Sequence, residues 1–178
     1  MPELQRLRAD HVPALLGFER ENRAYFAAAV PDRGDEYFAE FDARIAALLA
    51  EQATGGCHFH VLVAAEGTIV GRVNLVDVAD GAAELGYRIA EHATGRGLAR
   101  AAVAQICALA ATGYGLDTLR AKTTVDNHAS RAVLARTGFV PAGETVLSGR
   151  PGLLFVRDLL GYPPPEVVRG GHLVQCNE

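Results

Sequence analysis

The chain turns at Thr94-Gly95-Arg96-Gly97-Leu98-Ala99, where two glycines precede an apolar helical run. Glycine lets the backbone turn tightly and lets a ligand approach it closely. The free amides in the first turn of the following helix, together with the helix dipole, favour an anionic group, and Arg96 and Arg100 add positive charge. The stretch therefore predicts a site for a phosphate-bearing ligand, although taken alone it is equally typical of a simple turn before a helix.

Two other phosphate-binding patterns do not match this turn. A dinucleotide-binding fold needs Gly-x-Gly-x-x-Gly early in a βαβ unit, whereas here Arg100 stands at the third glycine and hairpin strands precede the turn. A P-loop needs Gly-Lys followed by Ser or Thr, and the chain has no such run. The sequence therefore argues against a nucleotide-dependent oxidoreductase.

The segments on either side of the turn predict a single domain of mixed α/β class. Apolar periodicity predicts helices over residues 10–28, 35–52, 98–111 and 129–137. Alternation predicts strands over residues 58–64, 69–76, 83–89, 118–125, 144–148 and 153–159. The first three of these strands are joined by short turns, which implies antiparallel hairpins. Pro163-Pro164-Pro165 interrupts regular structure, so we expect the domain to span residues 1–161 and residues 162–178 to form an extension, disordered or packed on a neighbour.

The composition narrows the function class. A net charge of −4 argues against broad nucleic-acid binding and is compatible with a cationic acceptor such as an amine. The chain has no run of eighteen apolar residues and no apolar signal segment, so we expect no membrane span and a cytoplasmic location. Three widely spaced cysteines fit neither a disulfide framework nor a zinc site, and His58 and His60 alternate along a strand without a third ligand. We therefore expect no bound metal.

A second informative stretch follows about thirty residues later, at Val125-Asp126-Asn127-His128-Ala129-Ser130. Asn127 and Ser130 are three residues apart, so at the start of a helix they face the same direction. Both residue types are also favoured at helix starts as caps, without any part in chemistry. The spacing alone leaves both interpretations open.

Together these stretches resemble the GNAT superfamily of N-acetyltransferases, and within it the RimJ/RimL-like branch. The resemblance spans roughly residues 1–160 and rests on four pieces in order: Ile69-Val70-Gly71-Arg72-Val73-Asn74, Ala83-Glu84-Leu85-Gly86-Tyr87, Gly95-Arg96-Gly97-Leu98-Ala99, and Asn127-His128-Ala129-Ser130 with Gly138-Phe139. Each piece is common, but the ordered set is specific. It implies a GNAT fold, in which helices flank a mostly antiparallel sheet with one splayed strand pair.

The resemblance also implies a cofactor, acetyl-coenzyme A. In that family the glycine-rich turn binds the pyrophosphate through backbone amides, which assigns Thr94, Gly95, Arg96, Gly97, Leu98 and Ala99 to the cofactor. The preceding strand, here around Ile89, splays from its neighbour and pairs with the pantetheine arm. Asn127 and Ser130 match the residues that contact the cofactor near its thioester.

The expected chemistry is direct attack of an amine on the acetyl thioester. We expect Glu84 to act as the general base through water, although it is equally well an ordinary solvent-facing carboxylate. A backbone amide near Ile89 is expected to stabilise the oxyanion, and Ser130, beside Asn127, to protonate the leaving sulfur. Tyr25 and Phe26 belong to a group of N-terminal aromatics expected in the core, some of them lining the acceptor pocket.

Several alternatives stay open at this stage. The resemblance implies a protein N-terminal α-amine as acceptor, while relatives also acetylate small-molecule amines and antibiotics. A non-catalytic module that binds acyl-coenzyme A would keep the turn but would need neither Glu84 nor Ser130. The sequence is also compatible with a homodimer.

Overall fold

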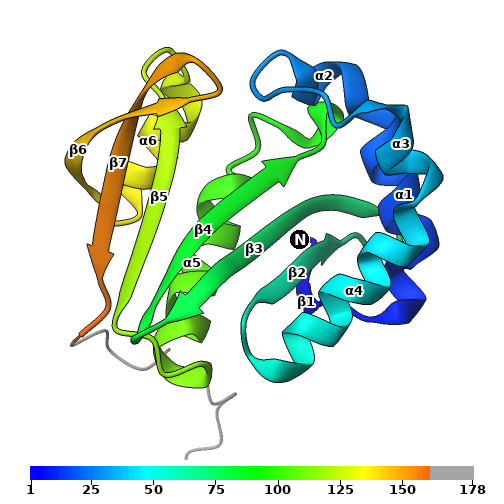
Figure 1. Cartoon of the computed structure of the whole chain (residues 1–178), viewed down its shortest axis with the longest axis horizontal. Helices are drawn as coiled ribbons and strands as arrows, with labels where there is room; N and C mark the ends of the chain where they lie inside the picture. The colour runs from blue at the N-terminus through cyan, green and yellow to red at the C-terminus, as the bar shows by residue number, and fades with distance from the viewer. Residues whose placement is uncertain (161–178) are drawn as a thin grey trace, which may run out of the picture.

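The computed structural model describes residues 1–160, which form one seven-stranded sheet with helices packed against it (Figure 1). The strands are β1 (Glu3–Arg6), β2 (His58–Val63), β3 (Ile69–Ala79), β4 (Ala82–Ile89), β5 (Thr118–Thr124), β6 (Val140–Leu147) and β7 (Arg150–Asp158). Their order across the sheet is β1-β2-β3-β4-β5-β7-β6, and every neighbouring pair is antiparallel except β4 with β5. The mixed, mostly antiparallel class is confirmed. The extension expected over 162–178 lies outside the described residues.

Helices pack against both faces of this sheet. They are α1 (Val12–Glu21), α2 (Arg23–Ala27), α3 (Gly34–Ala39), α4 (Phe41–Thr54), α5 (Leu98–Gly113) and α6 (His128–Arg136), with short 3-10 turns at Ala9–His11 and Glu91–Ala93. In Figure 1, α5 lies behind β3 and β4, whereas α4 lies in front of β2. The core between these layers includes Val73, Leu75 and Leu119, none of which has exposed surface.

The structure differs from the sequence expectation at three elements. Strand β1 was not expected, because its four residues show no clear apolar alternation; it pairs with β2 along the sheet edge. The helix expected over 10–28 breaks at Asn22, whose buried side chain donates to Phe18 O and accepts from Glu91 N–H. The helix expected over 35–52 is two helices that meet at Glu40, where the backbone leaves helical geometry.

Strands β4 and β5 separate along their length, and this opening positions the site. Their parallel ladder runs only from Ala82↔Thr118 to Leu85↔Ala121. Beyond it β4 stays paired with β3 as far as Ile89↔Gly71, and β5 stays paired with β7 as far as Thr124↔Gly152. Figure 1 shows the two arrows close at their lower ends and apart at their upper ends. The splayed strand pair is therefore present.

Gly71 holds the diverging end of β4 against β3. A Cβ added at this position would lie 2.8 Å from Ile89 Cδ1 and 3.1 Å from the carbonyl oxygen of Arg88. Both separations are shorter than ordinary van der Waals contact, so a side chain here would crowd the end of β4. Glycine at position 71 thus allows the end of β4 to lie close to β3.

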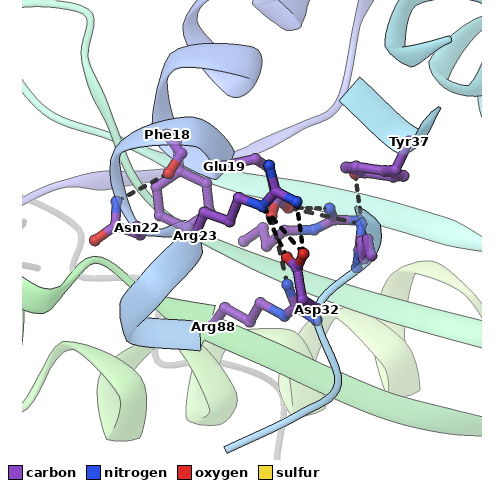
Figure 2. A network of polar contacts seen from close by, with 9 residues as sticks. Phe18, Glu19, Asn22, Arg23, Asp32, Tyr37 and Arg88 are labelled. Carbon is purple, nitrogen blue, oxygen red and sulfur yellow. Dashed lines mark hydrogen bonds and ion pairs between the residues drawn. The ribbon is translucent and has the colours of Figure 1, made fainter. Parts of the chain in front are cut away.

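A buried carboxylate joins α1 to the sheet on the face opposite α5. Glu19 has 2% of its surface exposed, and its Oε1 accepts from Arg72 of β3, which is also buried. Its Oε2 lies 3.4 Å from Arg88 Nη1 on β4, and Arg33 approaches to 4.0 Å. Figure 2 shows this network beside the separate pairing of Arg23 with Asp32. Charges buried in this way are tolerated only when they are paired.

Loss of the Glu19 charge is expected to destabilise the fold. Glu19→Gln keeps the volume but leaves Arg72 buried without its counter-ion, which we expect to lower the free energy of unfolding by about 3–5 kcal/mol. Urea unfolding followed by circular dichroism measures this change. Glu21→Gln, at the exposed end of the same helix, is the control and should change stability by less than about 0.5 kcal/mol. A loss below about 1 kcal/mol for Glu19→Gln would contradict the account.

Candidate functional site

The separated end of β4 presents backbone groups to the opening. The Ala90 N–H donates to Val70 O at 2.9 Å, which sets the alternation of hydrogen bonds between β4 and β3. By that alternation the N–H and C=O groups of Tyr87 and Ile89 point away from β3, toward β5. Both residues lie beyond the last β4–β5 pair, Leu85↔Ala121. The strand around Ile89 therefore has a free edge inside the sheet, suited to an extended ligand with amide groups.

The turn that follows β4 has the geometry of an anion site. Gly95 and Gly97 have φ of +74° and +75°, values that favour glycine, and Gly97 is the N-cap of α5. The first hydrogen bond within that helix joins Ala101 N–H to Gly97 O. The N–H groups of residues 98–100 precede this bond, so they have no carbonyl partner within the helix and can bind a ligand. Thr94 Oγ1 donates to Glu91 O at 2.8 Å and fixes the start of the turn.

One cavity of about 800 Å³ connects this turn to the opening in the sheet. Its walls come from five parts of the chain: the α2 segment, the end of β4 with the turn and the start of α5, the end of β5, α6 with the residues just before it, and Arg150 at the start of β7. The expected site residues that line it are Ile89, Thr94, Gly95, Gly97, Leu98, Ala99, Asn127 and Ser130. Arg96 is exposed and is not among the lining residues, although its neighbours on both sides are.

Asn127 and Ser130 lie together at the start of α6. The Oδ1 of Asn127 accepts from Ser130 N–H at 3.0 Å, so Asn127 is a helix cap. The Ser130 hydroxyl lies 2.9 Å from the Tyr87 hydroxyl, and Tyr87 also approaches Ser130 O at 3.3 Å. These contacts connect α6 to the diverging part of β4. They place a chain of two hydroxyl groups on one wall of the cavity.

Tyr87 is a site residue that sequence reasoning did not single out. Burial raises the pKa of its phenol, an effect that the Ser130 hydrogen bond opposes in part, so the group is protonated at neutral pH. The available signal was its position two residues before Ile89, which puts both side chains on the same face of β4. Its pairing with a residue 43 positions away could not be seen in the sequence.

Glu84 lies apart from these residues. It is on β4 within the part of the strand that is still paired with β5, and it does not line the cavity. Its Oε2 accepts from Lys122 Nζ at 2.6 Å, and both side chains are about one third exposed. Strand alternation puts Glu84, Gly86 and Arg88 on one face of β4 and Tyr87 on the other. Gly86 leaves open space between the two charged side chains.

The outer end of the cavity is lined by apolar residues and arginines. Tyr25, Phe26 and Val30 come from α2 and the segment after it, and Tyr25 and Val30 are each 40% exposed. Arg150 lies across from them and is paired with Asp126 at 2.5 Å, while its Nη1 donates to Ala29 O at 3.4 Å. This last contact joins the β6–β7 hairpin to the α2 segment across the opening, two parts that Figure 1 shows at the same end of the molecule.

The two strand histidines form a packed cluster on β2. His58 stacks on Tyr114 with ring centroids 3.6 Å apart, and His60 Nε2 lies 2.8 Å from the Tyr114 hydroxyl. Within residues 1–160, no group of three or more His, Cys, Asp or Glu side chains has an arrangement suited to a metal ion. In the same range, no helix is both long and apolar enough to cross a membrane.

Comparison with known proteins identifies the family. A family model described as an acetyltransferase (GNAT) domain matches residues 3–140, about three quarters of the chain. A search of curated protein sequences found no match.

Solved structures of acetyltransferases share the fold. Ribosomal-protein-S5-alanine acetyltransferase from Vibrio fischeri is 21% identical with a TM-score of 0.84, covering 90% of this chain and 94% of its own. RimJ from Mycobacterium smegmatis, solved with a coenzyme A disulfide, is 25% identical with a TM-score of 0.80, covering 90% and 83%. A spermidine N-acetyltransferase chimera of the Vibrio cholerae enzyme SpeG and hSSAT is 18% identical with a TM-score of 0.74, covering 89% and 95%.

The family match agrees with the splayed sheet, the glycine turn and the cavity that joins them. The chain therefore belongs to the GNAT acetyltransferase family and is an N-acetyltransferase, RimJ/RimL-like in structure, that uses acetyl-coenzyme A.

Proposed function

We propose that the protein transfers the acetyl group of acetyl-coenzyme A to a protein N-terminal α-amine, by direct attack within a ternary complex. One observation carries this proposal: a single cavity joins the anion-binding turn, the free edge of β4 and an outer opening between the α2 segment and the β6–β7 hairpin. The turn and the strand edge fit the cofactor. The outer end of the cavity, away from the turn, leaves room for an acceptor.

We infer the orientation of the cofactor from the chemistry of the cavity walls. The free amides of the turn at 94–100, at the positive end of the α5 dipole, suit the pyrophosphate. The amide groups of the pantetheine arm match the backbone of Tyr87 and Ile89 in the opening between β4 and β5. Bound in this way, acetyl-coenzyme A would supply an activated thioester near Ser130. The Ile89 N–H points away from β3 into the opening and is our candidate for stabilising the charge on the thioester oxygen.

The acceptor amine must be neutral to attack. An α-amine has an ordinary pKa of about 7.7–8.0, against about 10.4 for a lysine side chain, so an N-terminus needs only modest help from a base. We assign this help to Glu84, acting through water in the open space over Gly86. Lys122 occupies Oε2 of Glu84, which leaves Oε1 to accept the proton.

The remaining groups act on the departing sulfur. The amine nitrogen forms a C–N bond with the acetyl carbon while the C–S bond breaks, so the amine must lose one proton and the sulfur must gain one. Ser130 is our candidate donor, resupplied by the protonated phenol of Tyr87 at 2.9 Å. Asn127 contributes by capping α6, which fixes the position of Ser130. Asn127 is thus a positioning residue in this proposal.

One feature favours a protein N-terminus over a small amine. Structures that share the fold do not decide between them, since they include an acetyltransferase for an alanine of a ribosomal protein as well as an enzyme for spermidine. The outer end of the cavity has exposed apolar side chains at Tyr25 and Val30, which offer a surface to residues that follow the reacting amine. A small amine would need no such surface. Turnover of small amines with no activity on peptides would favour the small-molecule alternative.

The turn can be tested with a matched pair of glycines. Gly95 (φ +74°) lines the cavity and Gly67 (φ +84°) lies in the β2–β3 turn, and an added Cβ meets nothing within 4 Å at either position. Alanine costs about 1 kcal/mol of strain in both places. Only Gly95→Ala also blocks the approach of the pyrophosphate to the backbone. We expect it to raise the Kd for acetyl-coenzyme A about tenfold, measured by calorimetry.

The Gly67→Ala protein is the control for strain. It should lose the same stability as Gly95→Ala while its Kd for acetyl-coenzyme A stays within about twofold of wild type. Equal Kd values for the two variants would show that the turn does not hold the cofactor.

Proton transfer can be tested with Glu84→Gln and Ser130→Ala. Each should lower kcat about tenfold or more at pH 7, with little change in the Kd for acetyl-coenzyme A, because each removes a group that assists proton transfer. The rise of kcat/KM with pH should follow the ionisation of the amine, near pH 7.7–8.0 for an N-terminus, in the wild type and in both variants. Steady-state rates of thiol release between pH 6 and pH 9 measure both effects.

Glu144→Gln, an exposed carboxylate on β6, is the matched control for charge and should behave as wild type. An unaltered kcat in Glu84→Gln would rule that residue out as the base. Unchanged turnover in Ser130→Ala would remove its assignment as the proton donor. Saturable binding of acetyl-coenzyme A with no turnover on any amine would instead indicate a non-catalytic binding module.

A further inference from the structure

Arg88 lies where the main cavity meets a second, much smaller cavity. The small cavity is lined by Glu19, Arg33, Asp32 and Phe38, and it shares Phe26, Val30 and Arg88 with the main one. The Arg88 side chain is 22% exposed, and its Cζ lies 5.1 Å from the centre of the Phe26 ring. Arg88 and the Phe26 ring beside its guanidinium thus both contribute to the wall where the two cavities meet. Figure 2 shows Arg88 at the edge of the buried charge network.

The charges around Arg88 do not balance. The single carboxylate of Glu19 is shared by Arg72, Arg88 and Arg33, and it is nearest to Arg72. The neighbouring Arg23 is separately paired with Asp32 and Asp35, each at 2.6 Å. Four guanidinium groups therefore face three carboxylates among the described residues of this network, and the Arg88 contact with Glu19 is a longer one, 3.4 Å.

This surplus of positive charge acts on Arg88. Burial lowers its pKa to about 10, and repulsion from Arg33 adds to the effect, while Glu19 opposes it. An anion entering the cavity beside Arg88 would restore the balance, and an ammonium group there would be repelled. The other lining arginines are placed differently. Arg150 is already paired with Asp126, and Arg100 and Arg136 belong to the helices at the cofactor end.

The position of Arg88 relates this charge to the acceptor. Arg88 lies between Tyr87 and Ile89, the two residues whose backbone groups face the opening. Its side chain projects from one face of β4, and the Tyr87 side chain projects from the other face. The Tyr87 face carries Ser130 and the proposed thioester end of the cofactor. The Arg88 face carries Gly86 and Glu84, so it is the face from which the amine would approach. The guanidinium therefore lies beside the path of the acceptor.

We propose that Arg88 is a specificity-determining residue that binds a carboxylate carried by the acceptor a few bonds from its reacting amine, an inference that rests on the proposed function. The carboxylate belongs to an acidic side chain near a protein N-terminus or to a free amino acid. Glu19 and Phe26 hold the guanidinium in place for it. Polyamines are poor acceptors, because their additional ammonium groups meet the same positive charge.

Matched acceptors test the charge preference. Peptides that begin with alanine and differ only in a second residue of Glu, Gln or Lys should show kcat/KM in the order Glu, Gln, Lys, with at least about tenfold between the first two. Alanine compared with alaninamide tests the free amino acid as the source of the carboxylate, and spermidine tests the polyamine. A preference for the carboxylate, among the peptides or for alanine over alaninamide, supports the proposal. It also shows whether a peptide side chain or a free amino acid provides the carboxylate.

Variants then test the residue. Arg88→Gln should lower kcat/KM for the preferred acidic acceptor to within about threefold of its neutral partner, through KM rather than kcat. Arg88→Lys should keep part of the preference. Arg20→Gln, which removes one exposed charge from α1, is the control and should keep the full preference for the acidic acceptor. The Kd for acetyl-coenzyme A and the thermal midpoint of each variant show whether the cofactor site and the fold are intact.

The outcomes separate this inference from the proposed function. Equal kcat/KM for acidic and neutral acceptors in the wild type would overturn the role of Arg88 while leaving N-acetylation in place. An equal loss on acidic and neutral acceptors in Arg88→Gln would also overturn it. A lack of turnover on every acceptor would instead contradict the proposed function.

Discussion

The site depends on a constraint in the sheet: β4 pairs with β3 and β5 pairs with β7 up to their ends at the site, whereas β4 and β5 pair with each other over only a few residues. Because β3 holds β4 as far as Ile89, and β7 holds β5 as far as Thr124, the opening between them is built into the fold. The free backbone of β4, the start of α5 and the start of α6 all meet at this opening. The cavity therefore belongs to the sheet topology and needs no separate binding domain.

Alternation along β4 divides the groups around this opening into two sets. One face carries Tyr87, which contacts Ser130 at the start of α6. The other face carries Glu84 and Arg88, separated by the open space at Gly86. Arg88 in turn shares the buried carboxylate of Glu19 with Arg72, so the network that attaches α1 to the sheet also fixes a cation at the outer end of the cavity. The acceptor recognition proposed for Arg88 would therefore depend on the same residues that stabilise the fold.

Local patterns in the sequence predicted much of this arrangement. The glycine turn, the hairpins of β2 to β4 and the start of α6 each depend on residues close together in the chain, and each is present. The contacts that define the site are of another kind. Tyr87 and Ser130 are 43 residues apart, Glu84 and Lys122 are 38 apart, and Glu19 and Arg88 are 69 apart. Such pairs depend on how the elements pack, which periodicity and propensity do not specify.

A crystal structure with acetyl-coenzyme A tests the central claim most directly, because the claim is about where the cofactor lies. The account predicts pyrophosphate oxygens on the amides of residues 95–100, the pantetheine arm between β4 and β5 beside Tyr87 and Ile89, and the sulfur near Ser130 Oγ. Arg88 should remain on the far side of β4 from the arm, facing the empty acceptor space. A cofactor bound outside the opening, or a pyrophosphate away from the turn, would contradict the account.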